Sequence, residues 1–229
     1  MRWILTFCIV LLVLVIPAAG QTPEAGRNQI VTGGSGRVEV SPDQATLSVG
    51  GEAQRPTAAE AMNEVNRTAA QVLERWQQLG IRRADVRTSA VQVFPVYTSP
   101  RDGGAPQLAG YRATYVLTLT MTTLDLLGRA IDAAVAAGAN TIRGITFGLR
   151  DASKARTEAL ALAVREAREK AEAIAQAAGL RIKGIERIVE GGVEVQVREL
   201  TFSRAAATPT PVEPGTVTVM ASVTIVFSY

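Results

Sequence analysis

Residues 113–138, ATYVLTLTMTTLDLLGRAIDAAVAAG, change hydrophobic period part-way along, and this change decides the fold class. In the first half, apolar residues alternate with threonines; the apolar set is Ala113, Tyr115, Leu117, Leu119 and Met121. A period of two predicts a strand with one buried face. From Leu124 to Val135 the apolar residues recur at helical spacing, and Gly138 is placed to end that helix. A strand that leads directly into a helix predicts a sheet layered with helices.

The segments on either side continue this alternation of periods. Upstream, residues 86–97 predict a strand, and the loop at 99–108, which contains Pro and Gly, is expected to be a mobile hairpin connection. Before that strand, a helix begins at a capping box formed by Thr57 and Glu60 and ends at Gly80. A strand around residues 45–49 precedes this helix, and residues 142–149 predict the strand after residue 138. The order predicts an α+β fold: an antiparallel or mixed sheet with helices on one face and a ferredoxin-like βαββαβ core.

Residues 152–178 predict a long third helix that extends this core. Its alanines recur at every fourth position from Ala155 to Ala175. The row winds around the helix because four residues exceed one turn by about 40°. Leu160, Val164 and Ile174 are expected near the middle of the same face, with Ala178. Small residues in such a row let another element approach closely. Two interpretations remain open: the helix packs on the chain's own sheet, or it packs against another subunit.

The C-terminal part predicts further strands. A strand near residues 182–189 is expected to reach a turn at Gly191-Gly192, after which valines alternate. Residues 203–215 are rich in Pro, Thr and Ala, and we expect a mobile loop. From Val217 to Tyr229 every second residue is apolar, which predicts a strand long enough that it must bend, bulge or extend past its own sheet. Extension would offer an unpaired edge to a neighbouring chain.

The N-terminus has the three parts of a secretory signal peptide. Arg2 precedes an apolar run at 3–16, and small residues follow up to Gly20. A retained anchor is the alternative, but the run is shorter than the roughly 20 residues that span a bilayer. We therefore expect cleavage of residues 1–20, a flexible leader at 21–29 and a single domain at 30–229. The mature chain is expected to be periplasmic or secreted, without a transmembrane span.

Composition excludes most catalytic chemistry. The chain has no His, and its one Cys, Cys8, lies in the predicted signal peptide. The mature chain therefore lacks imidazole bases and thiol ligands. Basic and acidic residues, 24 against 21, are mixed along the chain without a basic stripe, so no nucleic-acid partner is expected. The glycines in Gly33-Gly34-Ser35-Gly36 lead into a strand and not a helix, so we interpret them as a turn or bulge and not a phosphate loop.

The remaining polar residues do not form a recognisable active site. Capping or solvated positions explain five aspartates: Asp85, Asp102, Asp125, Asp132 and Asp151. Four serines have no base beside them in a recognisable nucleophile arrangement: Ser35, Ser41, Ser89 and Ser153. We predict no catalytic, cofactor-binding or metal-binding residue and no cofactor. The chain is therefore not expected to be an enzyme.

Three groups of residues together resemble the SIMPL-domain family. They are Gly34-Ser35-Gly36 with Val38, Val40 and Pro42-Asp43; Gly138-Ala139-Asn140-Thr141-Ile142 with Ile145 and Phe147; and Ala159-Leu160, Ala163-Val164, Ala167 and Lys170-Ala171. The similarity covers about residues 30–229. It implies a periplasmic or secreted α+β protein, in a family where some members look like hollow homo-oligomers and others are associated with oxidative or envelope stress. The family brings no catalytic residues, and it makes Gly138 a helix stop and Asn140 a turn residue tolerant of left-handed geometry.

Two functional hypotheses follow. The first is a non-enzymatic envelope protein that assembles into a homo-oligomer and serves envelope integrity or tolerance of oxidative stress. The second is a monomeric periplasmic binding or adaptor module that captures a partner, as yet unidentified, through loops 99–108 and 203–215.

Overall fold

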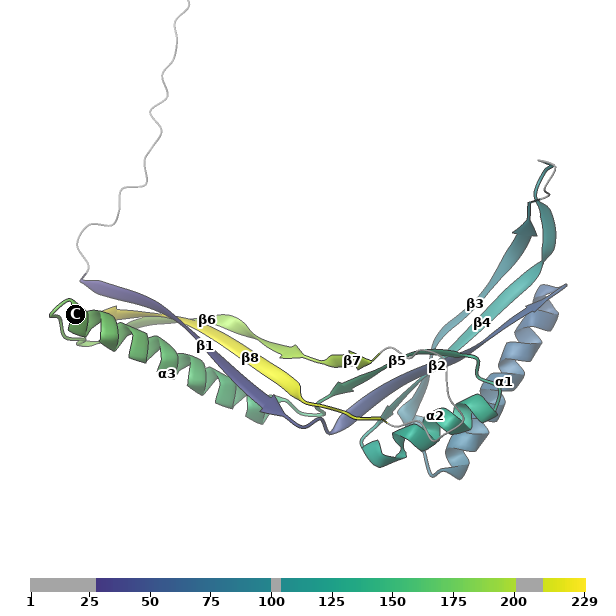
Figure 1. Cartoon of the computed structure of the whole chain (residues 1–229), viewed down its shortest axis with the longest axis horizontal. Helices are drawn as coiled ribbons and strands as arrows, with labels where there is room; N and C mark the ends of the chain where they lie inside the picture. Colours follow the sequence, from purple (N-terminus) through teal and green to yellow (C-terminus); the bar gives the residue numbers. More distant parts are fainter. Residues whose placement is uncertain (1–27, 100–103, 201–211) are drawn as a thin grey trace, which may run out of the picture.

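The computed structural model describes residues 28–99, 104–200 and 212–229, and its helices and antiparallel sheets confirm the α+β class. The strands form two sheets, and each sheet has its own helical cover (Figure 1). The predicted signal peptide, most of the leader, and residues 100–103 and 203–211 of the two predicted loops lie outside the described residues. The first strand already begins at Gln29, the last residue of the predicted leader.

The larger sheet has five strands in the order β3-β4-β2-β5-β7, all antiparallel to their neighbours. The strands are β2 (Gln44–Arg55), β3 (Val86–Thr98), β4 (Gln107–Met121), β5 (Thr141–Gly148) and β7 (Arg198–Leu200). Its helices are α1 (Ala58–Gln78) and α2 (Leu127–Ala136), with 3₁₀ turns at Arg83–Asp85 and Leu124–Leu126. The predicted sequence of strand, helix, strand, strand, helix and strand is thus observed from β2 to β5.

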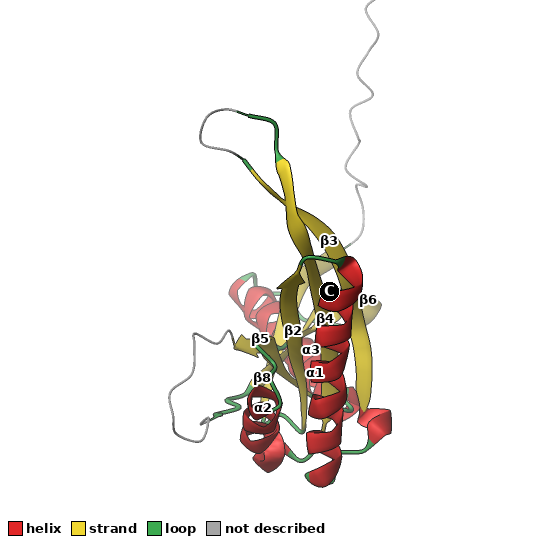
Figure 2. Cartoon of the chain, turned by 90° about the vertical axis from the view of Figure 1, so that its right-hand side faces the viewer, coloured by secondary structure: helices red, strands yellow, loops and turns green. Residues whose placement is uncertain are grey.

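Both helices pack on the same face of this sheet, as predicted (Figure 2). The predicted capping box is present at the start of α1, where Thr57 and Glu60 bind each other's backbone N–H. Trp76 is 1% exposed near the end of α1, and its indole N–H donates to the carbonyl of Ala130 in α2 at 2.8 Å. The core beneath the helices is built from the alternating apolar residues of β2, β4 and β5, among them Leu47, Leu119, Ile145 and Phe147.

The smaller sheet has three strands in the order β1-β8-β6, covered by helix α3 (Ser153–Ala177). The strands are β1 (Gln29–Val40), β6 (Gly184–Gln196) and β8 (Val217–Ser228). The whole alanine row of α3, from Ala155 to Ala175, is buried against β1 and β8. The row therefore packs on the chain's own sheet, which settles the two interpretations. The placement of Ile174 and Ala178 on the buried face was wrong, because both residues are exposed, Ile174 to 49%.

The interpretation of Gly33-Gly34-Ser35-Gly36 as a turn or bulge was also wrong. All four residues lie inside β1 and pair in continuous register with β8. A Cβ on Gly36 would overlap the carbonyl oxygen of Ala159, and a Cβ on Gly34 would overlap that of Ala163. These glycines let the backbone of α3 approach β1 closely. The predicted turn would instead have needed glycine for its backbone conformation.

One C-terminal prediction needs correction. The Gly191-Gly192 turn is a bulge within one continuous strand, β6, where Gly192 takes a φ of +108°. Of the three alternatives for the terminal strand, extension past its sheet is excluded, because each residue of β8 from Val217 to Ser228 pairs with β1. The alternation of apolar residues in β8 instead reflects that one face of this strand is buried under α3.

The β3–β4 ribbon extends beyond the first turn of α1 (Figures 1 and 2). No helix in the described part of the chain is long and apolar enough to cross a membrane.

Candidate functional site

A polar network joins β1 to α3 at the glycines of the first family segment. The Glu166 carboxylate accepts hydrogen bonds from the backbone N–H and the hydroxyl of Ser35. Lys170 pairs with Glu166 at 3.0 Å and donates to the carbonyl of Gly33 at 3.1 Å. The Ser35 N–H, with help from Lys170, lowers the pKa of Glu166 to about 2. The network therefore links α3 to β1 at the glycines, which have no side chains that could interlock with the helix.

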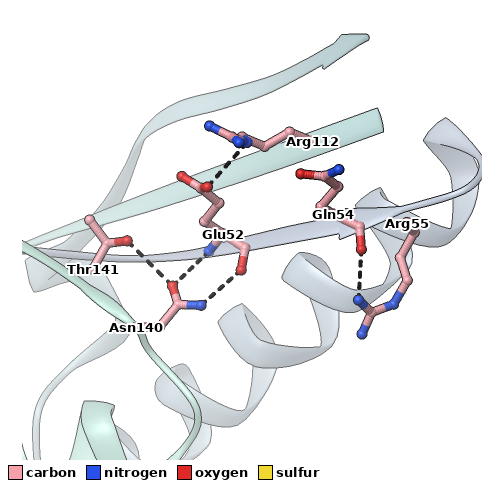
Figure 3. A network of polar contacts seen from close by, with 6 residues as sticks. All are labelled: Glu52, Gln54, Arg55, Arg112, Asn140 and Thr141. Atoms are coloured by element: carbon pink, nitrogen blue, oxygen red, sulfur yellow. Dashed lines mark hydrogen bonds and ion pairs between the residues drawn. The ribbon is translucent and has the colours of Figure 1, made fainter. Parts of the chain in front are cut away.

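The second family segment forms a clamp between the α2–β5 loop and β2 (Figure 3). The side-chain oxygen of Asn140 accepts from the backbone N–H of Glu52, and its amide donates to the Glu52 carbonyl, both at 2.8 Å. The Glu52 carboxylate meanwhile pairs with Arg112 on β4 at 3.2 Å. The last residue pair between β2 and β5 is Gly50 with Thr141. The side-chain amide of Asn140 therefore continues the hydrogen bonding to β2 beyond the end of the strand pairing.

The predicted turn geometry of Asn140 was wrong, because no described residue other than glycine has a positive φ. The predicted helix stop was right: Gly138 follows α2 with a φ of +95°.

The predicted polar candidates do not come together. Asp85 binds Arg82, whose guanidinium lowers the pKa of the Asp85 carboxyl. Asp151 accepts from Ser153, and this bonding lowers the Asp151 pKa. Asp125 and Asp132 lie in or beside α2, whereas Asp102 lies outside the described residues. Across the parts of the chain that are described, no three Cys, Asp or Glu residues are placed to hold a metal ion.

A hydroxyl-lined hollow of about 290 Å³ lies on the larger sheet. Thr118 is 4% exposed and shares hydrogen bonds with Ser48, at 3.3 Å, and with Ser89. Arg143 forms part of the wall. The hollow has no carboxylate or amine in its lining that could act as a base, so it can bind polar groups but has no means of activating a nucleophile. Sequence reasoning missed this grouping because Ser89 is the extra residue of a bulge in β3.

Apolar residues are exposed along two edge strands, β3 and β6. The β3–β4 ribbon presents Val91, Val93, Phe94, Tyr97 and Leu108, each between 41% and 59% exposed. On β6, Ile185, Ile188 and Val189 are between 41% and 52% exposed. Clusters of exposed large apolar side chains are typical of interaction surfaces. The apolar alternation of these strands could be read from the sequence, but its exposure could not.

Comparison with known families matches residues 30–227 to a single model, SIMPL, described as a protein of unknown function (DUF541). The chain belongs to the SIMPL family. The matched range includes the glycines of β1, the Asn140 clamp and the alanine row of α3.

Three similar proteins carry names without an enzymatic activity. The uncharacterised protein YggE of Edwardsiella ictaluri is 32% identical over 72% of this chain and 67% of its own length. The 26 kDa periplasmic immunogenic protein of Brucella melitensis is 32% identical over 71% of this chain and 65% of its own length. YggE of Escherichia coli is 28% identical over 71% of this chain and 69% of its own length. The matches thus span about two thirds of each relative.

Proposed function

We propose that this SIMPL protein is exported to the cell envelope and assembles into a homo-oligomer that acts by surface contact, without catalysis. The observation that carries the proposal is the pair of edge strands with uncovered apolar side chains, β3 and β6, which lie on different sheets. An edge strand offers unpaired backbone groups to another chain. Contact between the β3 edge of one copy and the β6 edge of the next would be head-to-tail, and such contacts close into rings when the rotation allows.

The mass of the purified mature chain in solution tests the assembly. Light scattering at micromolar concentration is expected to give a multiple of the mass of one chain. A monodisperse monomer under these conditions would refute self-assembly.

Variants on the two edges test the proposed contact. Tyr97→Glu and Ile188→Glu place a charge at positions that are 59% and 52% exposed, so each should leave the fold intact and lower the assembled mass. Ala161→Glu, at an exposed position of α3, is the matched control and should assemble like the unchanged chain. If only one edge variant lowers the mass, the contact joins like edges and not β3 to β6.

The export part of the proposal rests on the predicted signal peptide and on the periplasmic name of the Brucella relative. Cell fractionation and the N-terminal sequence of the mature chain test it, with cleavage expected after Gly20. A role in envelope integrity or oxidative-stress tolerance is part of the same proposal. A deletion strain that survives peroxide and detergent as well as its parent would remove that role.

The alternative is a monomeric binding module. One observation favours this alternative. Tyr97 and Leu108 form a cross-strand pair at the base of the loop at 99–108, and each is more than half exposed. A monomer that loses partner capture when this loop is shortened would support the alternative against assembly.

A further inference from the structure

A second hollow, of about 750 Å³, lies at the end of the larger sheet where β2 begins and β4 ends. This volume is within the range of pockets that hold small organic ligands. Its wall includes Arg82 and Asp85 from the 3₁₀ turn, Arg87 from the start of β3, and Arg150, which follows β5. Segments far apart in the sequence thus bring three guanidinium groups to one opening.

Two of these guanidinium groups have no partner among the described residues. Arg82 donates to both carboxylate oxygens of Asp85, at 2.9 and 2.7 Å, and is satisfied. Within the described ranges, the guanidinium groups of Arg87 and Arg150 make no ion pair or hydrogen bond. Asp43, the nearby acid, instead accepts the backbone N–H of Arg150 at 2.6 Å. Three arginines against one aspartate leave the lining with a net charge of +2.

The lining between the arginines mixes polar and apolar side chains. Ile81 and Met121 are 8% and 7% exposed and belong to the core, while Val86 and Leu126 are partly buried beside them. Threonine hydroxyls at 120, 122 and 123 also line the opening. Exposed arginines alone hold an anion weakly in water. Burial of a hydrocarbon against the apolar lining would add binding free energy in proportion to the area removed from water.

We propose that this hollow binds a small amphiphilic anion. Its carboxylate or phosphate head would lie between Arg87 and Arg150, which suit such groups because the guanidinium presents paired N–H donors to planar or tetrahedral oxyanions. Its hydrocarbon part would cover Ile81, Met121 and Leu126. The hollow lies within one chain. Its lining includes Val86 and Arg87 at the start of β3 but neither Tyr97 nor Ile188, the positions that test oligomer formation, so the two proposals can fail separately.

Titration calorimetry on the mature chain tests this proposal with four probes below their micelle concentrations. Decanoate and decyl phosphate carry head and tail, decanol carries only the tail, and inorganic phosphate carries only the head. We expect both amphiphiles to bind at least tenfold more tightly than either partial probe. Whichever of decanoate and decyl phosphate binds more tightly shows whether the natural head group is a carboxylate or a phosphate.

Paired variants locate the site. R87Q/R150Q should weaken decanoate binding at least tenfold, whereas R165Q/R168Q, the same charge change at exposed positions of α3, should leave it unchanged. Circular dichroism confirms that each variant is folded. Equal binding of decanol and decanoate, equal loss in both double variants, or no binding by any probe up to millimolar concentration would overturn the proposal.

Discussion

At Gly36, the absence of a side chain allows the α3 backbone to approach β1 closely, because a Cβ there would overlap the carbonyl of Ala159. Gly36→Ala should therefore lower the free energy of unfolding by about 1–3 kcal/mol, the usual cost of overpacking a site whose neighbours cannot move freely. Urea unfolding followed by circular dichroism measures this change.

Gly33 provides the matched control within the same strand. A Cβ on Gly33 would lie 3.9 Å from its nearest neighbour, the carbonyl oxygen of Val223, which is ordinary contact. Gly33→Ala should change the stability by less than about 1 kcal/mol. Equal costs at the two positions would contradict the close approach of α3 to β1.

The Asn140 clamp gives a second prediction at this scale. Asn140→Ala removes both hydrogen bonds to Glu52 and should cost about 1–2 kcal/mol of stability. Asn63→Ala, at an exposed position of α1, should cost less than about 0.5 kcal/mol. The sequence indicates that Asn140 is structural, but its partner lies 88 residues away, and no local pattern connects the two.

At the scale of the element, the contact between β1 and α3 should weaken in acid. The pKa of Glu166 is lowered from 4.5 to about 2, with the Ser35 N–H as the largest cause. A carboxyl whose folded pKa is depressed contributes stability above its unfolded pKa and loses it as pH falls through the folded value. The contribution of Glu166 is therefore expected to disappear between about pH 4.5 and pH 2.

Glu166→Gln tests this pH dependence. The variant should be less stable than the unchanged chain at pH 6, and the difference should shrink as pH approaches 2, as measured by urea unfolding at each pH. Glu169→Gln, at an exposed position of the same helix, should follow the unchanged chain throughout. A constant difference between Glu166→Gln and the unchanged chain across this range would show that the ionised carboxylate is not what stabilises the contact.

The strands show how far period alone predicts an element. Alternation from Val217 onward correctly predicts β8, and the alanine row correctly predicts α3. Alternation left open whether β8 bends, bulges or extends past its sheet, because it records which face is buried and not which strands lie on either side. The predicted turn at Gly191-Gly192 was wrong, since a bulge and a turn both place glycine at a positive φ.

At the scale of the whole molecule, we propose that residues 30–229 unfold as one unit. The β1–β2 connection is only residues 41–43, and Asp43 bonds to the Gly148 carbonyl and the Arg150 N–H beyond β5. Trp76 lies under the larger sheet, whereas Gly36 lies in the smaller one. Gly36→Ala should therefore shift the urea midpoint of Trp76 fluorescence as much as that of circular dichroism. Separate midpoints would divide the chain into two folding units.

The sequence by itself determined most of the elements and the α+β class, because period, caps and glycine stops act within a few residues of one another. It also excluded imidazole chemistry, because the chain has no His. Only the tertiary structure decided that the β1 glycines face α3, that β8 lies between β1 and β6, and that Arg87 and Arg150 share an opening. These facts depend on which distant segments come together. The free energy of packing over the whole chain sets which segments come together, whereas a local pattern shows only which of its own residues are buried.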